Sequence, residues 1–371
     1  MTSDTTSGPG SDAARRALPV VCIHDDRPEN AVGIVLAVLS CARHAPGFEV
    51  IVSAPGATHA FRDWLASQPN ARPMASEPTA GEGWNAKPAL LLALLDAHPA
   101  VVWLDSDIVL TADVTRFFTG LDDAVLVAAE EPYWGQEQGG TFRTVAWGLE
   151  PARRLTSTVN SGILRVTREH RPLLEAWRTM LGHATYRAAQ AKPWYERPLH
   201  MVGDQEALTG LLASSDFSHV PVVQLRRGHD IAQCFGPAGF TPLERLRSLR
   251  SGDPPFVHAM GPKPWIDPPA ASGARPSWTD RLRRRYRGLS LELSPYCPAV
   301  RAYVAQLGVE LAWSRPRSRL GRLLAATGGR RAAAMGWPLA IVDHGARWIR
   351  RRLGVARYRT SNDFVLRERP F

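Results

Sequence analysis

Two aspartates one residue apart interrupt an otherwise apolar stretch of the chain. Asp105 and Asp107 lie between residues 101–104 and 108–110, which contain only Val, Trp, Leu and Ile. Such a run predicts a strand buried on both faces, where an unpaired carboxylate is strongly disfavoured. Side chains at i and i+2 of a strand point the same way, so the two carboxylates should converge. We therefore predict a Mg²⁺ or Mn²⁺ site that also holds a diphosphate, with two solvated acids at a strand end as the alternative.

Polar residues at the expected ends of other elements are further candidates. Asp25 and Asp26 follow an apolar run at 19–23, and ligands of α/β sheets bind beyond such strand ends. The alternative is that they cap the next turn. Lys87, one of three lysines, precedes Pro88, where we expect a helix to begin. A phosphate bound at this helix N-terminus would explain a cation there, and a solvent-facing lysine is the alternative.

Three later motifs combine polar residues with elements that would hold them in place. An Asn-Ser-Gly triplet at 160–162 interrupts an apolar strand at 159–166, and glycine inside a strand indicates a bulge or the close approach of a ligand. The segment 204–206, Asp-Gln-Glu, opens a predicted helix that Asp204 could cap. His258 follows an apolar pair and precedes Gly, Pro, Lys and Pro in an expected stiff loop.

Strands and helices alternate along the first two thirds of the chain, which predicts an α/β fold with a parallel sheet. We expect residues 184–200 to be irregular. The predicted strands lie at 19–23, 48–52, 101–110, 124–129, 159–166 and 219–225, and the predicted helices at 30–44, 57–68, 88–97, 171–181 and 204–213.

The chain has 371 residues, 44% of them hydrophobic, enough for a large core. Its four cysteines are scattered, which indicates neither a disulfide framework nor a zinc site, and favours a reducing, cytoplasmic compartment. Residues 1–17 lack the apolar region of a signal peptide, so we expect them to be disordered. The sequence has no apolar run long enough to span a membrane.

The positive charge is concentrated at the end of the chain. Residues 268–371 hold 21 arginines, no lysine and 6 acids, a net charge of +15, so residues 1–267 carry −5 of the total of +10. We therefore predict a domain at 18–267, a linker at 268–273 and a basic extension over 268–371. Arginine mixes with apolar residues at 281–287 and 347–353.

Basic amphipathic segments of this kind can lie at the inner face of an anionic membrane. A solvated or oligomeric helical surface is an equal alternative. Nucleic acid is the least favoured partner, because no recognition motif accompanies the arginines.

Taken in order from about residue 20 to 265, the motifs resemble the family-8 glycosyltransferases, a retaining group that includes bacterial lipooligosaccharide galactosyltransferases and glycogenin. A lone Asp-x-Asp is weak evidence, whereas the final His-x-x-Gly-x-x-Lys-Pro-Trp in its proper position is specific. The matching residues are Ile23-His24-Asp25-Asp26, Lys87, Leu104-Asp105-Ser106-Asp107, Asn160-Ser161-Gly162, Asp204-Gln205-Glu206 and the stretch from His258 to Trp265.

The resemblance implies a GT-A fold, a Rossmann-like domain that binds a UDP-sugar. Its metal, Mn²⁺ with Mg²⁺ as the alternative, would be held by Asp105, Asp107 and His258. Lys263 and the backbone of Gly261 would contact the diphosphate. Asp25 or Asp26 would meet the uracil base. The other residues that the resemblance assigns to the donor are Lys87, Ser106, Asn160, Ser161, Asp204 and Gln205, of which Asp204 and Gln205 would be catalytic.

By this resemblance the chain is a hexosyltransferase that moves galactose or glucose to a hydroxyl of a glycan, a glycolipid or another acceptor, with retention. Gln205 is a poor nucleophile, so we favour front-side attack. An inverting enzyme is one alternative, with Glu130, Glu131 or Glu206 as the general base that it needs. A decayed transferase that binds anionic lipid or nucleic acid is the other.

The sequence departs from the family at two places. Glu206 stands where the family commonly has aspartate, and residues 27–30 replace a usual tyrosine, so UDP is favoured on weaker grounds. Acceptors should bind at the loops 130–148 and 184–200, since such loops carry function.

Overall fold

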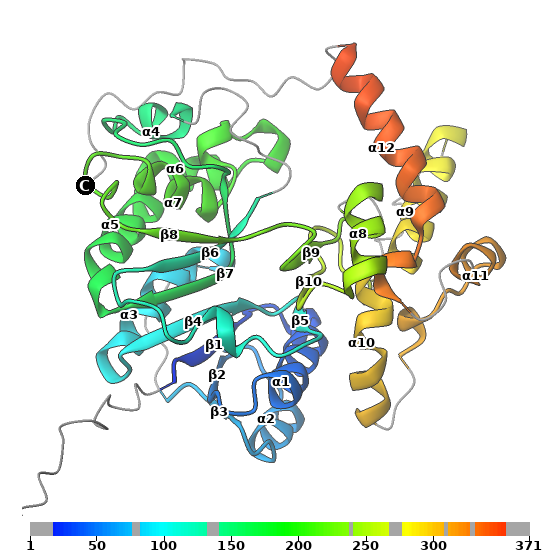
Figure 1. The fold of residues 1–371 in the computed structure, drawn as a ribbon, viewed down its shortest axis with the longest axis horizontal. Coiled ribbons are helices and arrows are strands. Elements are labelled where there is room, and N and C mark those ends of the chain that lie inside the picture. Colours follow the sequence, from blue (N-terminus) through cyan, green and yellow to red (C-terminus); the bar gives the residue numbers. More distant parts are fainter. Residues whose placement is uncertain are drawn as a thin grey trace, which may run out of the picture.

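The computed structural model describes residues 18–75, 82–131, 141–236, 240–266, 277–307, 311–326 and 331–353 (Figure 1). The N-terminus predicted to be disordered, residues 132–140 of the first predicted acceptor loop, and the predicted linker at 268–273 lie outside the described residues. The predicted basic extension over 268–371 lies within them only in part, whereas the predicted strands, helices and site residues all lie within them.

A seven-stranded sheet forms the centre of the α/β part, in the order β3-β2-β1-β4-β7-β6-β8. β7 runs antiparallel to β4 and β6, whereas the other pairs are parallel. The sheet is therefore mixed: most pairs are parallel, as predicted, and β7 is the antiparallel exception. An antiparallel neighbour needs no helical crossover, and among the described residues of the connection between β6 and β7 the one helix is the short α4 (Phe142–Ala146). The strands are β1 (Val20–His24), β2 (Val50–Ser53), β3 (Ala71–Pro73), β4 (Ala100–Asp105), β6 (Leu126–Glu130), β7 (Val159–Thr167) and β8 (Val222–Leu225).

Helices cover both faces of this sheet and give it two apolar cores (Figure 1). One core includes α3 (Lys87–Ala97), α5 (Arg171–Gly182) and α7 (Asp204–Leu212), and the other includes α1 (Ala31–His44) and α2 (His59–Ala66). The predicted α/β fold class is confirmed.

Residues 184–200 are not irregular throughout, contrary to the prediction. They begin with the helix α6 (Ala184–Gln190). The imidazole of His183 caps this helix by accepting from the amide of Thr185, and Tyr186 is buried in the first core. The segment therefore becomes helical through a cap and a tertiary contact that its polar composition conceals.

The predicted strand at 101–110 is two strands in two sheets. β4 ends at Asp105, residues 106 and 107 form a turn, and β5 (Ile108–Leu110) joins a small sheet with β10 (Phe256–His258) and β9 (Ile231–Gln233). The break lies at the acidic residues, because carboxylates are disfavoured inside a buried ladder. The turn moves the chain from the large sheet to the small one.

The C-terminal region is helical, as predicted, and lies on one side of the molecule (Figure 1). α10 (Tyr296–Val304) packs against α1 and the small sheet, and the hydroxyl of Tyr303 donates to the carbonyl of Leu110. The other helices on this side are α8 (Pro242–Ser251), α9 (Trp278–Glu292), α11 (Arg319–Ala326) and α12 (Trp337–Arg352). Within the part of the chain that the structure describes, no helix is long and apolar enough to cross a membrane.

Candidate metal and donor site

The small sheet brings the histidine of the last motif to the two aspartates. β10 pairs antiparallel with β5 so that His258 lies opposite Ile108, the residue after Asp107. Asp105, Asp107 and His258 can each offer a ligand atom within 4.8 Å of the others. His258 Nε2 lies 3.2 Å from Asp107 Oδ1, and both side chains are buried. The carboxylates therefore converge as predicted, across a turn rather than along one strand.

The surroundings of this cluster fit a divalent cation. His258 Nδ1 is buried and has no hydrogen-bond partner among the described residues. A Cβ at Gly162 would lie 2.8 Å from His258 Cε1 and 3.1 Å from Asp105 Oδ2, so this glycine keeps open the space beside both groups. Two carboxylates and one imidazole suit Mn²⁺ better than the all-oxygen preference of Mg²⁺.

Asp107 is held in its ionised form, which a metal ligand requires. Burial alone would raise the pKa of this carboxyl. Lys263 and His258 outweigh that effect and lower the pKa below its ordinary value. The Lys263 ammonium contacts Asp107 Oδ2 and donates to the carbonyl of Ala259 at 2.9 Å.

Lys87 begins α3 and is buried, so the solvent-facing alternative is wrong. Its ammonium lies 3.0 Å from Asp105 Oδ1 and 3.4 Å from Asp204 Oδ2, and it donates to Ser161 Oγ at 2.9 Å. Burial would lower the pKa of Lys87, but the two carboxylates raise it above its ordinary value. Lys87, which we expected to bind a phosphate, therefore already forms ion pairs with two carboxylates.

Asp204 faces Lys87 instead of capping its own helix. The N-cap of α7 is Gly203, without a side-chain bond, so the capping alternative is wrong. Asp204 Oδ2 accepts from Ser161 Oγ at 2.6 Å, and burial raises the pKa of this carboxyl. The Nε1 of Trp177 donates to the Asp204 carbonyl at 2.9 Å and fixes the start of the helix.

Gln205 and Asn160 meet at a buried acid, Glu131. Both amide nitrogens donate to Glu131 Oε2, at 3.0 Å from Gln205 and 2.8 Å from Asn160. Asn160 Nδ2 also lies 3.3 Å from Gln205 Oε1. These bonds fix which end of the Gln205 amide is the oxygen. Glu131 sits just after β6, and only its proximity to that strand end could have indicated its role from sequence.

Glu206, where the resemblance leads us to expect aspartate, has a fixed partner. Its carboxylate forms a buried ion pair with Arg143 of α4 (Phe142–Ala146), a residue that the sequence analysis missed. Burial raises the pKa of Glu206. Glu130 Oε2 accepts from the amide of Arg227 at 2.8 Å. Each of the carboxylates that we named as an alternative base therefore has a structural partner.

Asp25 holds the first-strand turn together. Its carboxylate accepts from the backbone amide of Arg27 at 3.1 Å, from Arg27 Nε at 2.9 Å, from Asn30 at 3.0 Å and from Ser106 Oγ at 2.6 Å. The turn-capping interpretation is confirmed for this residue. Burial opposes ionisation, but the Arg27 and Ser106 bonds lower the pKa of Asp25. Asp26 accepts from the amide of Gly83 at 2.8 Å.

A cleft of about 200 Å³ opens beside these residues. The sequence analysis missed part of its wall, including two tryptophans. Trp103 Nε1 donates to Asp105 Oδ1 at 2.7 Å, and half-exposed Trp84 lies on another wall. The i, i+2 spacing of Trp103 and Asp105 on one strand was the available signal. Predicted site residues that line the cleft are Asp25, Lys87, Asp105, Ser106, Asp107, Gly261 and Lys263.

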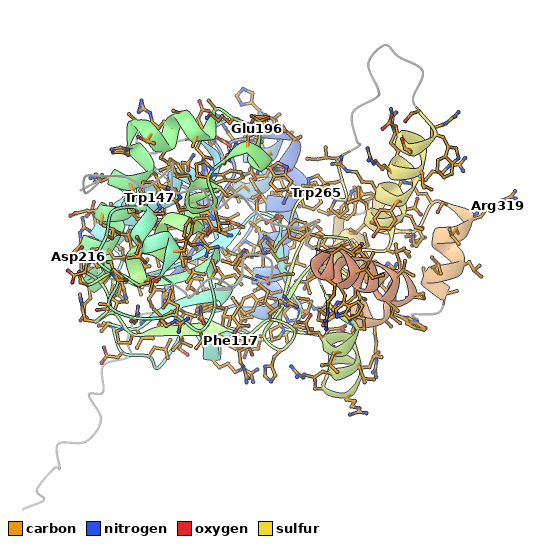
Figure 2. The ribbon with its side chains drawn as sticks, turned by 90° about the horizontal axis from the view of Figure 1, so that it is seen from above. Phe117, Trp147, Glu196, Asp216, Trp265 and Arg319 are labelled. Carbon is orange, nitrogen blue, oxygen red and sulfur yellow. The ribbon has the colours of Figure 1, made fainter. Side chains whose placement is uncertain are left out.

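The last motif closes one side of the cleft. Gly261 has φ of +70°, and a Cβ there would lie 2.8 Å from the ring of Phe235, so only glycine fits without strain. Trp265 Nε1 donates to Asn30 Oδ1 at 3.3 Å, and its ring packs against Tyr296 of α10. Figure 2 shows Trp265 between the sheet and the C-terminal helices. The motif thus joins the candidate site to the extension.

No family model matches the sequence, and no curated protein matches it. Solved structures do match, as the WbbM bifunctional glycosyltransferase, the galactosyltransferase LgtC and the glycosyltransferase GlyE of Streptococcus pneumoniae illustrate. Their identities are 17%, 20% and 14%, and their TM-scores 0.45, 0.41 and 0.43. The alignments cover 70%, 67% and 81% of this chain, and 48%, 90% and 66% of those chains. All three are glycosyltransferases, the class that the motifs imply, but likeness at this level carries no inference about activity.

Proposed function

We propose that the chain is a metal-dependent glycosyltransferase whose donor is a nucleotide-diphosphate sugar. The observation that supports this most is the convergence of Asp105, Asp107 and His258, from two distant segments, beside a cleft of about 200 Å³. We assign these three residues as the ligands of a Mn²⁺ ion. When bound there, Mn²⁺ would act as a Lewis acid that neutralises the leaving diphosphate.

The donor assignment follows the cations and aromatic groups of the cleft. We propose that Lys263 binds a phosphate oxygen by a charge-assisted hydrogen bond, beside the backbone of Gly261. The base of the nucleotide, UDP by the resemblance, would lie toward Asp26 and the exposed ring of Trp84. Arg27 is half-exposed on the same wall. Asp25 would not contact the base itself but would hold in place the turn that carries Arg27.

We propose that transfer proceeds with retention. The sugar would lie against Lys87, Asp204 and Gln205, with the Gln205 carbonyl oriented by Glu131. An amide is a poor nucleophile, so the acceptor hydroxyl would attack from the side of the leaving group and give its proton to the leaving phosphate. The inverting alternative is weaker, because Glu206 is paired with Arg143 and Glu131 holds two amides.

The test is release of nucleoside diphosphate from a panel of UDP- and GDP-sugars. We expect turnover of UDP-glucose or UDP-galactose with Mn²⁺, loss of turnover with a chelator, and an α-configured product by NMR. His258→Asn should reduce Mn²⁺ binding measured by electron paramagnetic resonance, whereas His59→Asn, at an exposed position of α2, should not. Metal-independent turnover, or unchanged Mn²⁺ binding in His258→Asn, would contradict the proposal.

A further inference from the structure

The helix α8 has its polar and apolar faces exchanged. Arg245 and Ser248 are 2% and 1% exposed, whereas Leu243, Leu246 and Leu249 are 69%, 49% and 39% exposed. A helix at the surface of a globular domain normally turns its apolar face inward. These three leucines lie three residues apart and therefore form one stripe along the outside of α8.

Fixed contacts impose this orientation. Thr241 and Glu244 form a capping box that sets where α8 begins. The guanidinium of Arg245 donates to the carbonyl of Phe240 at 2.9 Å and to that of Ala333 at 2.9 Å. Burial lowers the pKa of Arg245 to about 10, still well above neutrality, so the residue stays charged. Rotating α8 to bury its leucines would break these bonds and remove the donor from the buried carbonyls of Ala333 and Met335.

α12 extends the apolar stripe, because it packs against α8. Ile341, Val342 and Ile349 are exposed on α12. Trp348 is also exposed, and the guanidinium of Arg352 lies 5.1 Å from the centre of its ring. The two neighbouring helices each expose aliphatic side chains, and α12 also exposes an indole and an arginine.

α9 adds charge and a second stripe. All of its residues are described and none is buried. Trp278, Leu282 and Tyr286 are exposed four residues apart, which places them on one face. The Tyr286 hydroxyl donates to Asp343 of α12 at 2.6 Å and links the two helices. Exposed arginines occupy other positions of α9, at Arg281, Arg283, Arg284, Arg285 and Arg287.

We propose that α8, α9 and α12 form a docking surface for an anionic phospholipid bilayer. The exposed leucines and tryptophans would enter the boundary between headgroups and acyl chains, and the arginines would bind lipid phosphates. The charge of +15 over residues 268–371 is complementary to such a surface. A second copy of the chain fits poorly, because it would bring like-charged surfaces together. Nucleic acid would engage the arginines but leave the leucines unexplained.

The test is co-sedimentation of the full chain with lipid vesicles. We expect at least about tenfold tighter binding to equimolar phosphatidylcholine and phosphatidylglycerol than to phosphatidylcholine alone. The variant L243S/L246S/L249S should weaken binding to the mixed vesicles about tenfold or more. The matched control L18S/V145S/V223S removes three exposed apolar residues elsewhere and should bind like the parent. Far-UV circular dichroism and thermal unfolding should show that both variants are folded.

Charge is tested separately with R283Q/R284Q/R285Q, which should lower affinity for mixed vesicles, against R62Q/R154Q/R178Q, which changes exposed arginines elsewhere. Equal binding to neutral and mixed vesicles would overturn the proposal, as would full binding by the α8 leucine variant. If the parent does not bind vesicles but forms a dimer that the α8 leucine variant cannot form, the surface binds a second copy of the chain. If the parent binds duplex DNA but not vesicles, the surface binds nucleic acid. Because no donor is present in the assay, its outcome does not depend on the transferase activity.

Discussion

The candidate site and the C-terminal helical surface hold their positive charges in opposite ways. In the site, Lys87 and Lys263 are largely buried, and each contacts a carboxylate. On the helical surface, Arg283 and its neighbours on α9 stand in solvent beside exposed apolar side chains. Figure 2 shows the C-terminal helices on one side of the molecule, with Arg319 of α11 at their outer end.

This difference separates two uses of a cation. A buried ammonium with fixed partners acts at short range, is screened little by salt, and is strongly disfavoured if a partner is lost. An exposed guanidinium contributes little to folding even where it has an exposed partner, as Arg283 has in Asp280 at 3.8 Å, but it adds to a field that attracts anionic surfaces. The two regions should therefore respond differently to mutation, to pH and to salt.

The largest effect is expected for Lys87→Met. This change removes the cation between Asp105 and Asp204 and leaves Asp204 buried without its partner charge. We expect the free energy of unfolding in urea to fall by about 3–5 kcal/mol. Adding Asp204→Asn should recover part of this loss. Arg283→Met, the matched change on α9, should be indistinguishable from the parent. Equal stability of Lys87→Met and the parent would mean that the buried and exposed cations do not differ.

Asp107→Asn should reduce donor turnover by about 10²–10³-fold, the range seen when one group that stabilises developing charge is removed. The substitution keeps the size of the side chain but removes the charge that faces His258 and Lys263. Asp63→Asn, on the exposed side of α2, is the control. Vesicle binding by Asp107→Asn should match that of the parent, and a parallel loss of both activities would contradict the separation of the two regions.

Local pattern was sufficient for most of the fold. The predicted helix at 30–44 is α1 (Ala31–His44), because a dense apolar face and the strand before it leave few alternatives. The bulge predicted from Asn160-Ser161-Gly162 is confirmed: the partner of Ala128 is Leu164, whereas the partner of Ala129 is Asn160. Strand direction could not be predicted, since an apolar run reads the same in a parallel and an antiparallel ladder.

Less of the site could be predicted, because its contacts join distant segments. The convergence of Asp105, Asp107 and His258 followed from motif order and is observed. Their roles as ligands stay a prediction. Arg143 carries no local signal, since it lies in a five-residue helix, and the position of Glu131 after a strand end did not predict its bonds to Asn160 and Gln205. The reversed faces of α8 could not be predicted for the same reason, because Arg245 of α8 donates to the carbonyl of Ala333, which lies far along the chain.

The buried histidine His170 should make the free energy of unfolding depend on pH. His170 accepts from the amide of Thr167 and donates to the carbonyl of Ala124, and burial lowers its pKa from 6.5 to about 4. Between these values the unfolded chain binds more protons than the folded chain, so stability falls as pH falls. The parent should lose about 2 kcal/mol from this group between pH 7 and pH 5.

Urea unfolding of His170→Gln at both pH values isolates this loss, with His59→Gln as the exposed control. If the stability of His170→Gln falls with pH as steeply as that of the parent, the buried histidine is not the cause.

The smallest expected effect in free energy is that of salt, which should change the affinity for anionic vesicles about tenfold and leave the candidate site nearly unaffected. Raising the ionic strength shortens the range over which the exposed arginines of α9 attract anionic lipid, so binding to mixed vesicles should fall about tenfold or more. The leucine stripe of α8 should retain the remainder, because burial of apolar surface is not screened. Donor turnover and the unfolding difference between the parent and Lys87→Met should change much less, since the contacts of Lys87 exclude water and mobile ions. If vesicle binding does not depend on salt, the arginines of the extension do not contribute to it. The buried and exposed cations would then differ only in their effect on folding stability.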